Sequence, residues 1–247
     1  MSDWTLVTGG NRGLGLEFVR QSLAGGAGGQ PRHVVAACRH PGRATALNAL
    51  AGDYPGRVKV LPLVVRDARS RGELVRELPL AIGADGRIDR LINNAGVLHS
   101  GERFGHLDAA VLDDSLQTNV VGPLLLTQAL APWLADADPA RKRAGARIAN
   151  LSSTLGAMGT TTRFGTPGYA ISKAALNMAT VQLACALAAR GIVVVALHPG
   201  WVRTDMGGEQ AQLAPADAVA ALLARIDALE TRDSGRFLDA EGRVLPW

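Results

Sequence analysis

The sequence predicts an α/β protein with a single doubly wound domain, in which a parallel seven-stranded sheet carries helices on both faces. Short runs rich in Val, Ile and Leu alternate along the chain with longer stretches of helical pattern. The short runs are apolar throughout, which is typical of parallel strands that are covered on both faces. We found no internal repeat and no long low-complexity linker, so one domain over residues 1–247 is expected.

The expected elements follow from these runs in chain order. The strands are predicted at Trp4–Val7, His33–Ala37, Val58–Leu63, Ile88–Asn93, Arg147–Leu151, Ile192–Leu197 and, more weakly, Arg236–Leu238. The helices are predicted at Leu14–Leu23, Arg43–Ala51, Ser70–Leu80, Ala109–Ala135, Tyr169–Arg190 and Pro215–Leu229. Gly25–Gly29 is interpreted as a turn and Ala135–Gly145 as a polar connection.

Composition narrows the class of protein. The chain is 47% hydrophobic and 19% charged with a formal net charge of +4, which is ordinary for a globular protein. The basic run Arg141–Arg143 has no interleaved aromatic residues, so we interpret it as a solvated loop and expect no nucleic-acid partner. Two cysteines, Cys38 and Cys185, form no CxxC motif, which argues against a disulfide framework or a metal site.

The sequence indicates neither a secretory signal nor a membrane span. The start of the chain has no charged-then-apolar signal pattern, and no apolar run approaches the roughly 20 residues of a membrane span. The expectation is therefore a cytoplasmic protein with no membrane partner.

A glycine-rich loop joins the first strand to the first helix in the stretch TLVTGGNRGLGLEFVR. Glycines let backbone N–H groups approach a pyrophosphate closely, and the N-terminus of the helix favours the anion. The pattern is TGxxxGxG rather than GxGxxG. We expect a dinucleotide here, held by Gly9, Asn11, Arg12, Gly13, Leu14 and Gly15.

The end of the second strand bears on the choice of dinucleotide. An NAD-selective site usually has an acidic side chain here for the ribose hydroxyls, whereas this sequence reads VVAACRHPGR. Arg39 could bind a 2′-phosphate as a planar fork, and Arg12 is a second candidate. We therefore favour NADP(H) over NAD(H); the alternative is that Arg39 is a solvated loop residue.

The stretch GYAISKAAL places Tyr169 and Lys173 four residues apart in a predicted helix, on one face. An ammonium beside a phenol lowers the phenol pKa and prepares it for proton transfer. The spacing is common by chance, so the pair alone does not distinguish a proton-transfer site from an exposed turn.

Further motifs occur in order along the chain: LINNAGV, QTNVVGPLLLTQALAPWL, RIANLSS and HPGWVRTDMGG. Together with the glycine loop and the Tyr–Lys pair, they resemble the short-chain dehydrogenase/reductase superfamily over essentially the whole chain. The stretches GGNRGLGLEFVRQ, AACRHPGRATAL and SGRFLDAEGRVLPW resemble its C-factor/Sniffer-like carbonyl reductase branch. The resemblance implies a Rossmann-type fold, a nicotinamide cofactor and a homodimer or homotetramer.

The resemblance also implies residue roles. Tyr169 would exchange a proton with the substrate, Ser153 would hydrogen-bond the carbonyl oxygen, Lys173 would hold the nicotinamide ribose, and Asn119 would position a water. Further contacts to the cofactor would come from Asn93, Ala95, Gly96, Pro199, Gly200, Val202 and Thr204.

Two departures from the family pattern stand out. Val64, followed by Val65, occupies the position of an aspartate that contacts adenine, and Asp67 is too far along to replace it. Val64 and Val65 are still expected to border the cofactor. Ser153 and Tyr169 are also farther apart than usual, with a Gly- and Thr-rich loop between them.

The leading interpretation is an NADPH-dependent carbonyl reductase acting on a small uncharged ketone or aldehyde. The alternatives are oxidation of a secondary alcohol, a C-factor-like nucleotide-binding signalling or sensor protein with little turnover, and a Rossmann-type methyltransferase. Trp201 and Met206 either border the substrate or pack, and His99 is interpreted as a loop residue rather than a base.

Overall fold

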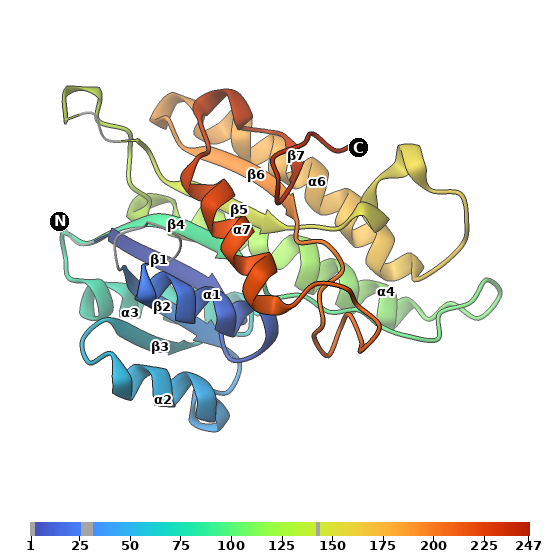
Figure 1. The fold of residues 1–247 in the computed structure, drawn as a ribbon, viewed down its shortest axis with the longest axis horizontal. Coiled ribbons are helices and arrows are strands. Elements are labelled where there is room, and N and C mark those ends of the chain that lie inside the picture. The colour runs from blue at the N-terminus through green and yellow to red at the C-terminus, as the bar shows by residue number, and fades with distance from the viewer. Residues whose placement is uncertain (1–2, 26–31, 142–143) are drawn as a thin grey trace.

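A computed structural model describes residues 3–25, 32–141 and 144–247. Its seven strands are β1 (Asp3–Thr8), β2 (His33–Cys38), β3 (Val58–Pro62), β4 (Arg87–Asn93), β5 (Arg147–Leu151), β6 (Val193–His198) and β7 (Phe237–Asp239). They form one sheet in the order β3-β2-β1-β4-β5-β6-β7, and every pair is parallel (Figure 1). The predicted fold class is confirmed. Most of the turn at Gly25–Gly29 and of the basic run Arg141–Arg143 falls outside the described residues.

Seven helices connect the strands and cover both faces of the sheet. They are α1 (Gly13–Ala24), α2 (Thr45–Asp53), α3 (Ala68–Ile82), α4 (Ala109–Leu116), α5 (Gly122–Leu130), α6 (Pro167–Leu187) and α7 (Pro215–Asp227). α1, α2 and α7 bury their apolar side chains on one face, and α3, α5 and α6 bury theirs on the other. This two-sided cover explains why the strands are apolar at successive positions.

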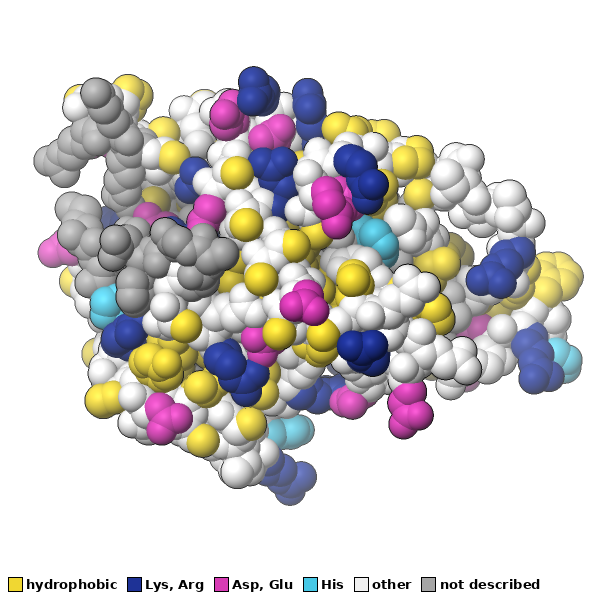
Figure 2. Space-filling view, in the orientation of Figure 1, with side chains coloured by type: hydrophobic (Ala, Val, Ile, Leu, Met, Phe, Trp, Pro, Cys, Tyr) yellow, Lys and Arg dark blue, Asp and Glu magenta, His cyan; other side chains and the backbone are white. Residues whose placement is uncertain are grey.

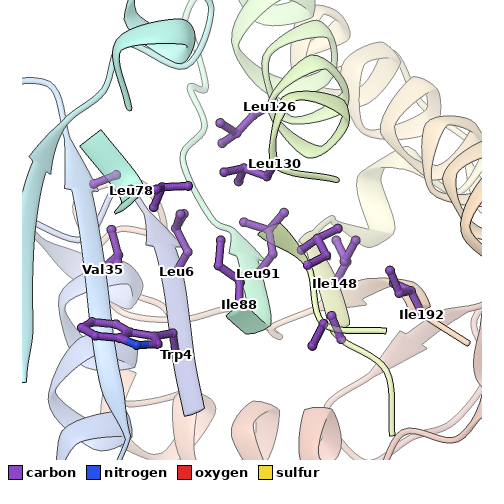
Figure 3. Close-up of a cluster of buried hydrophobic side chains, with 14 of the residues drawn as sticks. Trp4, Leu6, Val35, Leu78, Ile88, Leu91, Leu126, Leu130, Ile148 and Ile192 are labelled. Atoms are coloured by element: carbon purple, nitrogen blue, oxygen red, sulfur yellow. The ribbon is translucent and has the colours of Figure 1, made fainter. Parts of the chain in front are cut away.

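The core is therefore divided in two by the sheet. Figure 3 shows one half, in which Leu78, Leu126 and Leu130 of the helices meet Leu6 and Leu91 of the central strands. The other half is built around Phe18 and Leu47 from α1 and α2, with Leu222 from α7. Because both faces of the central strands are fixed by packing, the carboxyl ends of these strands form a rigid rim.

The predicted helix Ala109–Ala135 is not one regular α-helix. α4 passes into a π-helical turn at Gln117–Val121, after which α5 continues in the same direction. The amide of Gly122 donates to the carbonyl of Gln117, five residues back. Pro123 follows directly and has no N–H to donate within the helix. The turn contains Asn119, and π-helical turns within α-helices frequently mark functional sites.

The helix α6 differs from the expectation that no apolar run approaches the length of a membrane span. The helical segment Pro167–Arg190 is long and apolar enough to meet a membrane-span criterion by length and composition. Half of the residues in its most apolar window are buried inside the protein. It packs along β6 and contributes Leu183 and Leu187 to the core, which is the behaviour of a core helix.

On the face of the molecule drawn in Figure 2, basic and acidic side chains lie interspersed. That face therefore shows no broad field of one sign.

Candidate active site

A cavity of about 420 Å³ lies along the carboxyl ends of the strands. Residues at or after the ends of six of the seven strands line this cavity. It therefore crosses the point between β1 and β4 where the order in which strands are added to the sheet reverses. Ligands of open parallel sheets bind at this point. The lining residues include the predicted Gly9, Asn11, Arg12, Gly13, Leu14, Arg39, Val64, Val65, Ala95, Gly96, Tyr169, Lys173, Pro199 and Thr204.

The glycine loop opens α1 toward this cavity. Arg12 precedes the helix in an extended conformation, and no side chain caps the first amide groups of α1. The first turn also carries no acidic side chain. Uncapped N–H groups at the positive end of a helix are a binding site for an anion. The loop therefore fits the pyrophosphate of a dinucleotide.

A clasp of hydrogen bonds holds the glycine loop against the segment after β4. The hydroxyl of Thr8 accepts from the amides of Asn94 and Ala95, both at 3.0 Å. The side-chain amide of Asn94 donates in return to the carbonyl of Thr8 at 2.9 Å. Sequence reasoning assigned no role to Thr8 or to the Asn94 side chain, because their contact joins segments 86 residues apart.

Tyr169, Lys173 and Ser153 meet at the end of the cavity beyond β5. Ser153 lies close enough to Tyr169 for its hydroxyl to lower the pKa of the phenol, although a long loop separates the two residues in sequence. Lys173 donates to the carbonyl oxygen of Leu151 at 2.7 Å, and its nitrogen lies 5.3 Å from the centroid of the Tyr169 ring. The neighbouring Ser152 instead donates to Asn177 at 2.7 Å. Of the two serines, Ser153 is therefore the one directed at Tyr169.

The pKa values at this site differ from the sequence-based expectation. Burial raises the pKa of Tyr169 to about 12, and the hydrogen bond from Ser153 lowers it only in part. Burial also lowers the pKa of Lys173 to about 8. The net shift of the phenol pKa is therefore opposite to the expected lowering, because loss of solvent around the phenol raises it.

The side chain of Asn119 makes hydrogen bonds to two separate segments of the chain. Its Oδ1 accepts from the amide of Val97 at 2.8 Å, and its Nδ2 donates to the carbonyl of Val97 and to Ser172, both at 2.9 Å. Both amide hydrogens of the side chain are thus used, and the residue is only 1% exposed. Asn119 therefore joins the segment after β4 to α6.

Several predicted cofactor residues lie behind the cavity wall and do not line it. Asn93 is buried and donates to Asn150 at 2.8 Å, so it links β4 to β5. Val202 is buried and pairs with Leu213, which also packs against Gly200. Gly15 is buried against the loop: a β-carbon there would lie 2.1 Å from the carbonyl oxygen of Gly9. These four residues are not part of the cavity lining.

Residues that sequence reasoning missed also line the cavity. Arg66, Val97, Asp114 and Thr118 are among them, and Met206 lines it whereas Trp201 does not. Asp114 binds Arg66 at 2.7 Å and His99 at 2.9 Å. No single-residue signal in the sequence would have selected them, because each reaches the cavity through the packing of a separate element. Among the described residues no group of His, Cys, Asp and Glu is suited to hold a metal ion.

The parallel sheet, its strand order and the glycine loop at the start of α1 define a Rossmann-type fold. A model of the short chain dehydrogenase family matches residues 3–214. The chain belongs to this family of oxidoreductases.

Individual relatives narrow the branch. C-signal of Myxococcus xanthus is 42% identical over 162 residues, which cover 66% of this chain and 94% of that protein. The structure of the carbonyl reductase Sniffer of D. melanogaster matches with a TM-score of 0.90 at 33% identity over the full length of both chains. An NADPH-bound carbonyl reductase from chicken fatty liver matches with a TM-score of 0.89 at 34% identity, over 100% of this chain and 99% of that one. The chain thus falls in the carbonyl reductase and C-factor-like branch.

Proposed function

We propose that the protein is an NADPH-dependent reductase that converts a small ketone or aldehyde to the alcohol, with Tyr169 as the proton donor. The observation that carries the proposal is that Tyr169 and the buried Lys173 lie side by side in the lining of a cavity that fits a dinucleotide, with Ser153 next to Tyr169. A reduced nicotinamide, when bound, supplies the hydride that goes to the carbonyl carbon.

Two residues of this chain would stabilise the negative charge that develops on the carbonyl oxygen of the substrate. As negative charge develops there, Tyr169 transfers its hydroxyl proton to the oxygen, and Ser153 donates a hydrogen bond to it. A Tyr169 pKa of about 12 keeps the phenol protonated at neutral pH, which suits a proton donor.

Lys173 and Asn119 position the reacting groups. With a pKa of about 8, Lys173 is mostly protonated at pH 7 and can hold ribose hydroxyls. Asn119 fixes the backbone at Val97 and the start of α6 through Ser172. Both residues are almost completely buried, so their geometry is set by packing.

The preference for NADPH rests on the cavity near β2. Arg39 lines the cavity at the end of β2, where no carboxylate lies beside it to repel a 2′-phosphate. Structures of related reductases that contain NADPH or NADP support the same preference. For assembly, we propose a homodimer or homotetramer; Ile171 and Met178 on α6 are more than half exposed.

A second candidate is a nucleotide-binding signalling protein with little turnover. Its support is the identity to a relative named C-signal and the loss of the usual carboxylate at Val64. The complete set of Asn119, Ser153, Tyr169 and Lys173 favours the reductase, because a sensor needs no proton donor.

The test is to titrate the purified protein with NADPH and NADH, and then to follow NADPH oxidation with a panel of ketones, aldehydes and quinones. The Tyr169→Phe variant is assayed in parallel: it should bind NADPH within about twofold of wild type and lose at least about a hundredfold in kcat. Tight binding without turnover on a broad panel would favour the sensor. Wild-type rates in the variant would remove Tyr169 from the chemistry.

A further inference from the structure

The adenine end of the proposed cofactor site lacks the carboxylate that its strand would be expected to supply. Val64 follows β3 and lines the cavity with an apolar side chain. Asp67, the next acidic residue, accepts from the amide of Ser70 at 2.6 Å and caps α3. It does not line the cavity. An adenine amino group placed beside Val64 would therefore find no acceptor on this strand.

Another element supplies a carboxylate to the same cavity. Asp114 projects from α4 and lines the cavity together with Val64, Val65 and Arg66. Its side chain is 27% exposed, so it is accessible to a ligand while being partly shielded from solvent.

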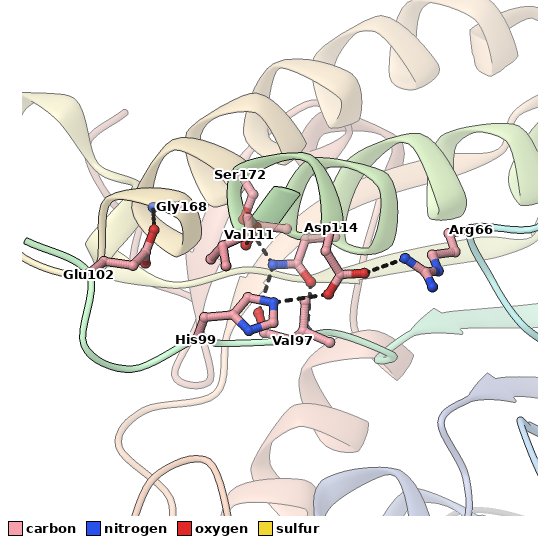
Figure 4. Close-up of polar contacts among 10 residues, drawn as sticks. Arg66, Val97, His99, Glu102, Val111, Asp114, Gly168 and Ser172 are labelled. Carbon is pink, nitrogen blue, oxygen red and sulfur yellow. Dashed lines mark hydrogen bonds and ion pairs between the residues drawn. The ribbon is translucent and has the colours of Figure 1, made fainter. Parts of the chain in front are cut away.

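The orientation of this carboxylate is fixed by two partners from different loops. Arg66 donates to Oδ1 at 2.7 Å, and His99 contacts Oδ2 at 2.9 Å. Figure 4 shows Asp114 held between them. A carboxylate has about four acceptor sites, so each oxygen keeps capacity for a further donor.

The sheet order tells which part of the ligand reaches Asp114. With the pyrophosphate at the start of α1, the nicotinamide half points toward Tyr169 and Lys173, beyond β5. The adenosine half then lies over the ends of β2 and β3, where Arg39 and Val64 line the cavity. Val64 and Val65 offer an apolar wall to the base, and Asp114, bound to Arg66 two residues after Val64, is an acidic residue of the cavity lining next to that wall.

We propose that Asp114, held by Arg66 and His99, accepts the adenine 6-amino group and takes the place of the carboxylate missing at Val64. The inference rests on the proposed function. It predicts recognition of the base itself: replacing the 6-amino group by a carbonyl, as in hypoxanthine, would put an oxygen against the carboxylate and remove the donor.

The experiment measures dissociation constants, by quenching of intrinsic fluorescence, for NADPH and for its hypoxanthine analogue. The wild-type protein should bind NADPH at least about tenfold more tightly than the analogue, the scale of a hydrogen bond to a charged group. Asp114→Asn should bring the ratio below about threefold, because a side-chain amide can accept from the amino group or donate to the carbonyl.

Asp113→Asn is the matched control, since Asp113 is the preceding residue on α4, is exposed and contacts Gln117. It should keep the wild-type ratio. Equal binding of the two nucleotides by the wild-type protein would overturn the role of Asp114 while leaving the reductase intact, and so would an unchanged ratio in Asp114→Asn. Failure of the wild-type protein to bind either NADPH or NADH would instead overturn the proposed function.

Discussion

Lys173 donates a hydrogen bond to the carbonyl oxygen of Leu151, which ties the buried ammonium on α6 to the end of β5. The side chain is 5% exposed, and burial lowers its pKa from 10.5 to about 8. One hydrogen bond to a carbonyl does not replace the solvation that the ammonium loses. The protein thus keeps a buried charge at neutral pH at a cost in stability.

This cost predicts how stability changes with pH. Between pH 8 and 10.5 the unfolded chain holds a proton on Lys173 that the folded protein releases, so the free energy of unfolding rises with pH. Lys173→Met lacks this contribution. The stability of wild type relative to the variant should rise by about 2 kcal/mol from about pH 7.5 to 9.5, as measured by urea unfolding. Parallel curves for the two proteins would mean that Lys173 keeps an ordinary pKa.

The cavity has two arginines that could hold a 2′-phosphate, and their surroundings differ. Arg12 forms an ion pair with Asp205, whereas Arg39 forms no ion pair within the described part of the chain. Arg39→Ala should weaken NADPH binding about tenfold and leave NADH binding nearly unchanged, because only NADPH carries the phosphate.

Arg12→Ala is the matched comparison, and its effect on NADPH should be smaller because Asp205 competes for that guanidinium. Titration of both variants with both nucleotides measures the difference. Equal weakening of NADPH and NADH in Arg39→Ala would show that the residue contacts something common to the two cofactors.

The fold could be predicted because the decisive signals are local. His33–Cys38 is buried at nearly every position, so its sequence is apolar without alternation and indicates a strand covered on both faces. The break in the helix after Ala109 was not predictable from apolar periodicity. A π-helical turn differs from an α-helical one only in its hydrogen-bond pattern over a few residues, and only Pro123 hints at it in the sequence.

The site was predictable where one segment carries the chemistry. The glycine loop and the Tyr169/Lys173 pair are such segments, and the structure places both at the cavity. The clasp between Thr8 and Asn94 and the binding of Asp114 by His99 join distant segments, so no spacing indicates them. The direction of the Tyr169 pKa shift was not predictable for a related reason. Burial raises this pKa, and burial is a property of the tertiary structure.

Glu102 holds the start of the helix that carries Tyr169. Its Oε1 accepts from the amide of Gly168 at 3.0 Å, and the preceding Thr166 gives α6 no side-chain cap (Figure 4). A carboxylate at a helix N-terminus is stabilising. Glu102→Ala should destabilise the protein by about 1–2 kcal/mol in urea unfolding and lower kcat several-fold with little change in NADPH affinity.

The conservative variant separates positioning from general damage. Glu102→Gln keeps an acceptor for Gly168 and should recover most of the lost kcat. Glu77→Ala removes an exposed carboxylate from α3 and should leave stability and kcat unchanged. If Glu102→Ala lowered NADPH affinity as strongly as kcat, Glu102 would be acting on the cofactor site rather than on the placement of Tyr169.

Gly15 tests whether close contact between α1 and its loop is needed for cofactor binding. A β-carbon there would lie 2.1 Å from the carbonyl oxygen of Gly9 and 2.6 Å from the side-chain nitrogen of Asn94. The loop would have to move away from the helix that supplies its anion-binding amides. Gly15→Ala should therefore weaken NADPH binding at least about tenfold, measured by fluorescence titration.

Gly52 provides the control because it also lies in a helix, α2, yet its β-carbon would meet no atom within 4 Å. Alanine is a better helix former than glycine, so Gly52→Ala should raise stability by about 0.5–1 kcal/mol and leave NADPH affinity unchanged. The same gain in helix propensity operates at Gly15. Any loss in the Gly15 variant is therefore steric, and an NADPH affinity equal to wild type would mean that the loop relaxes without disturbing the site.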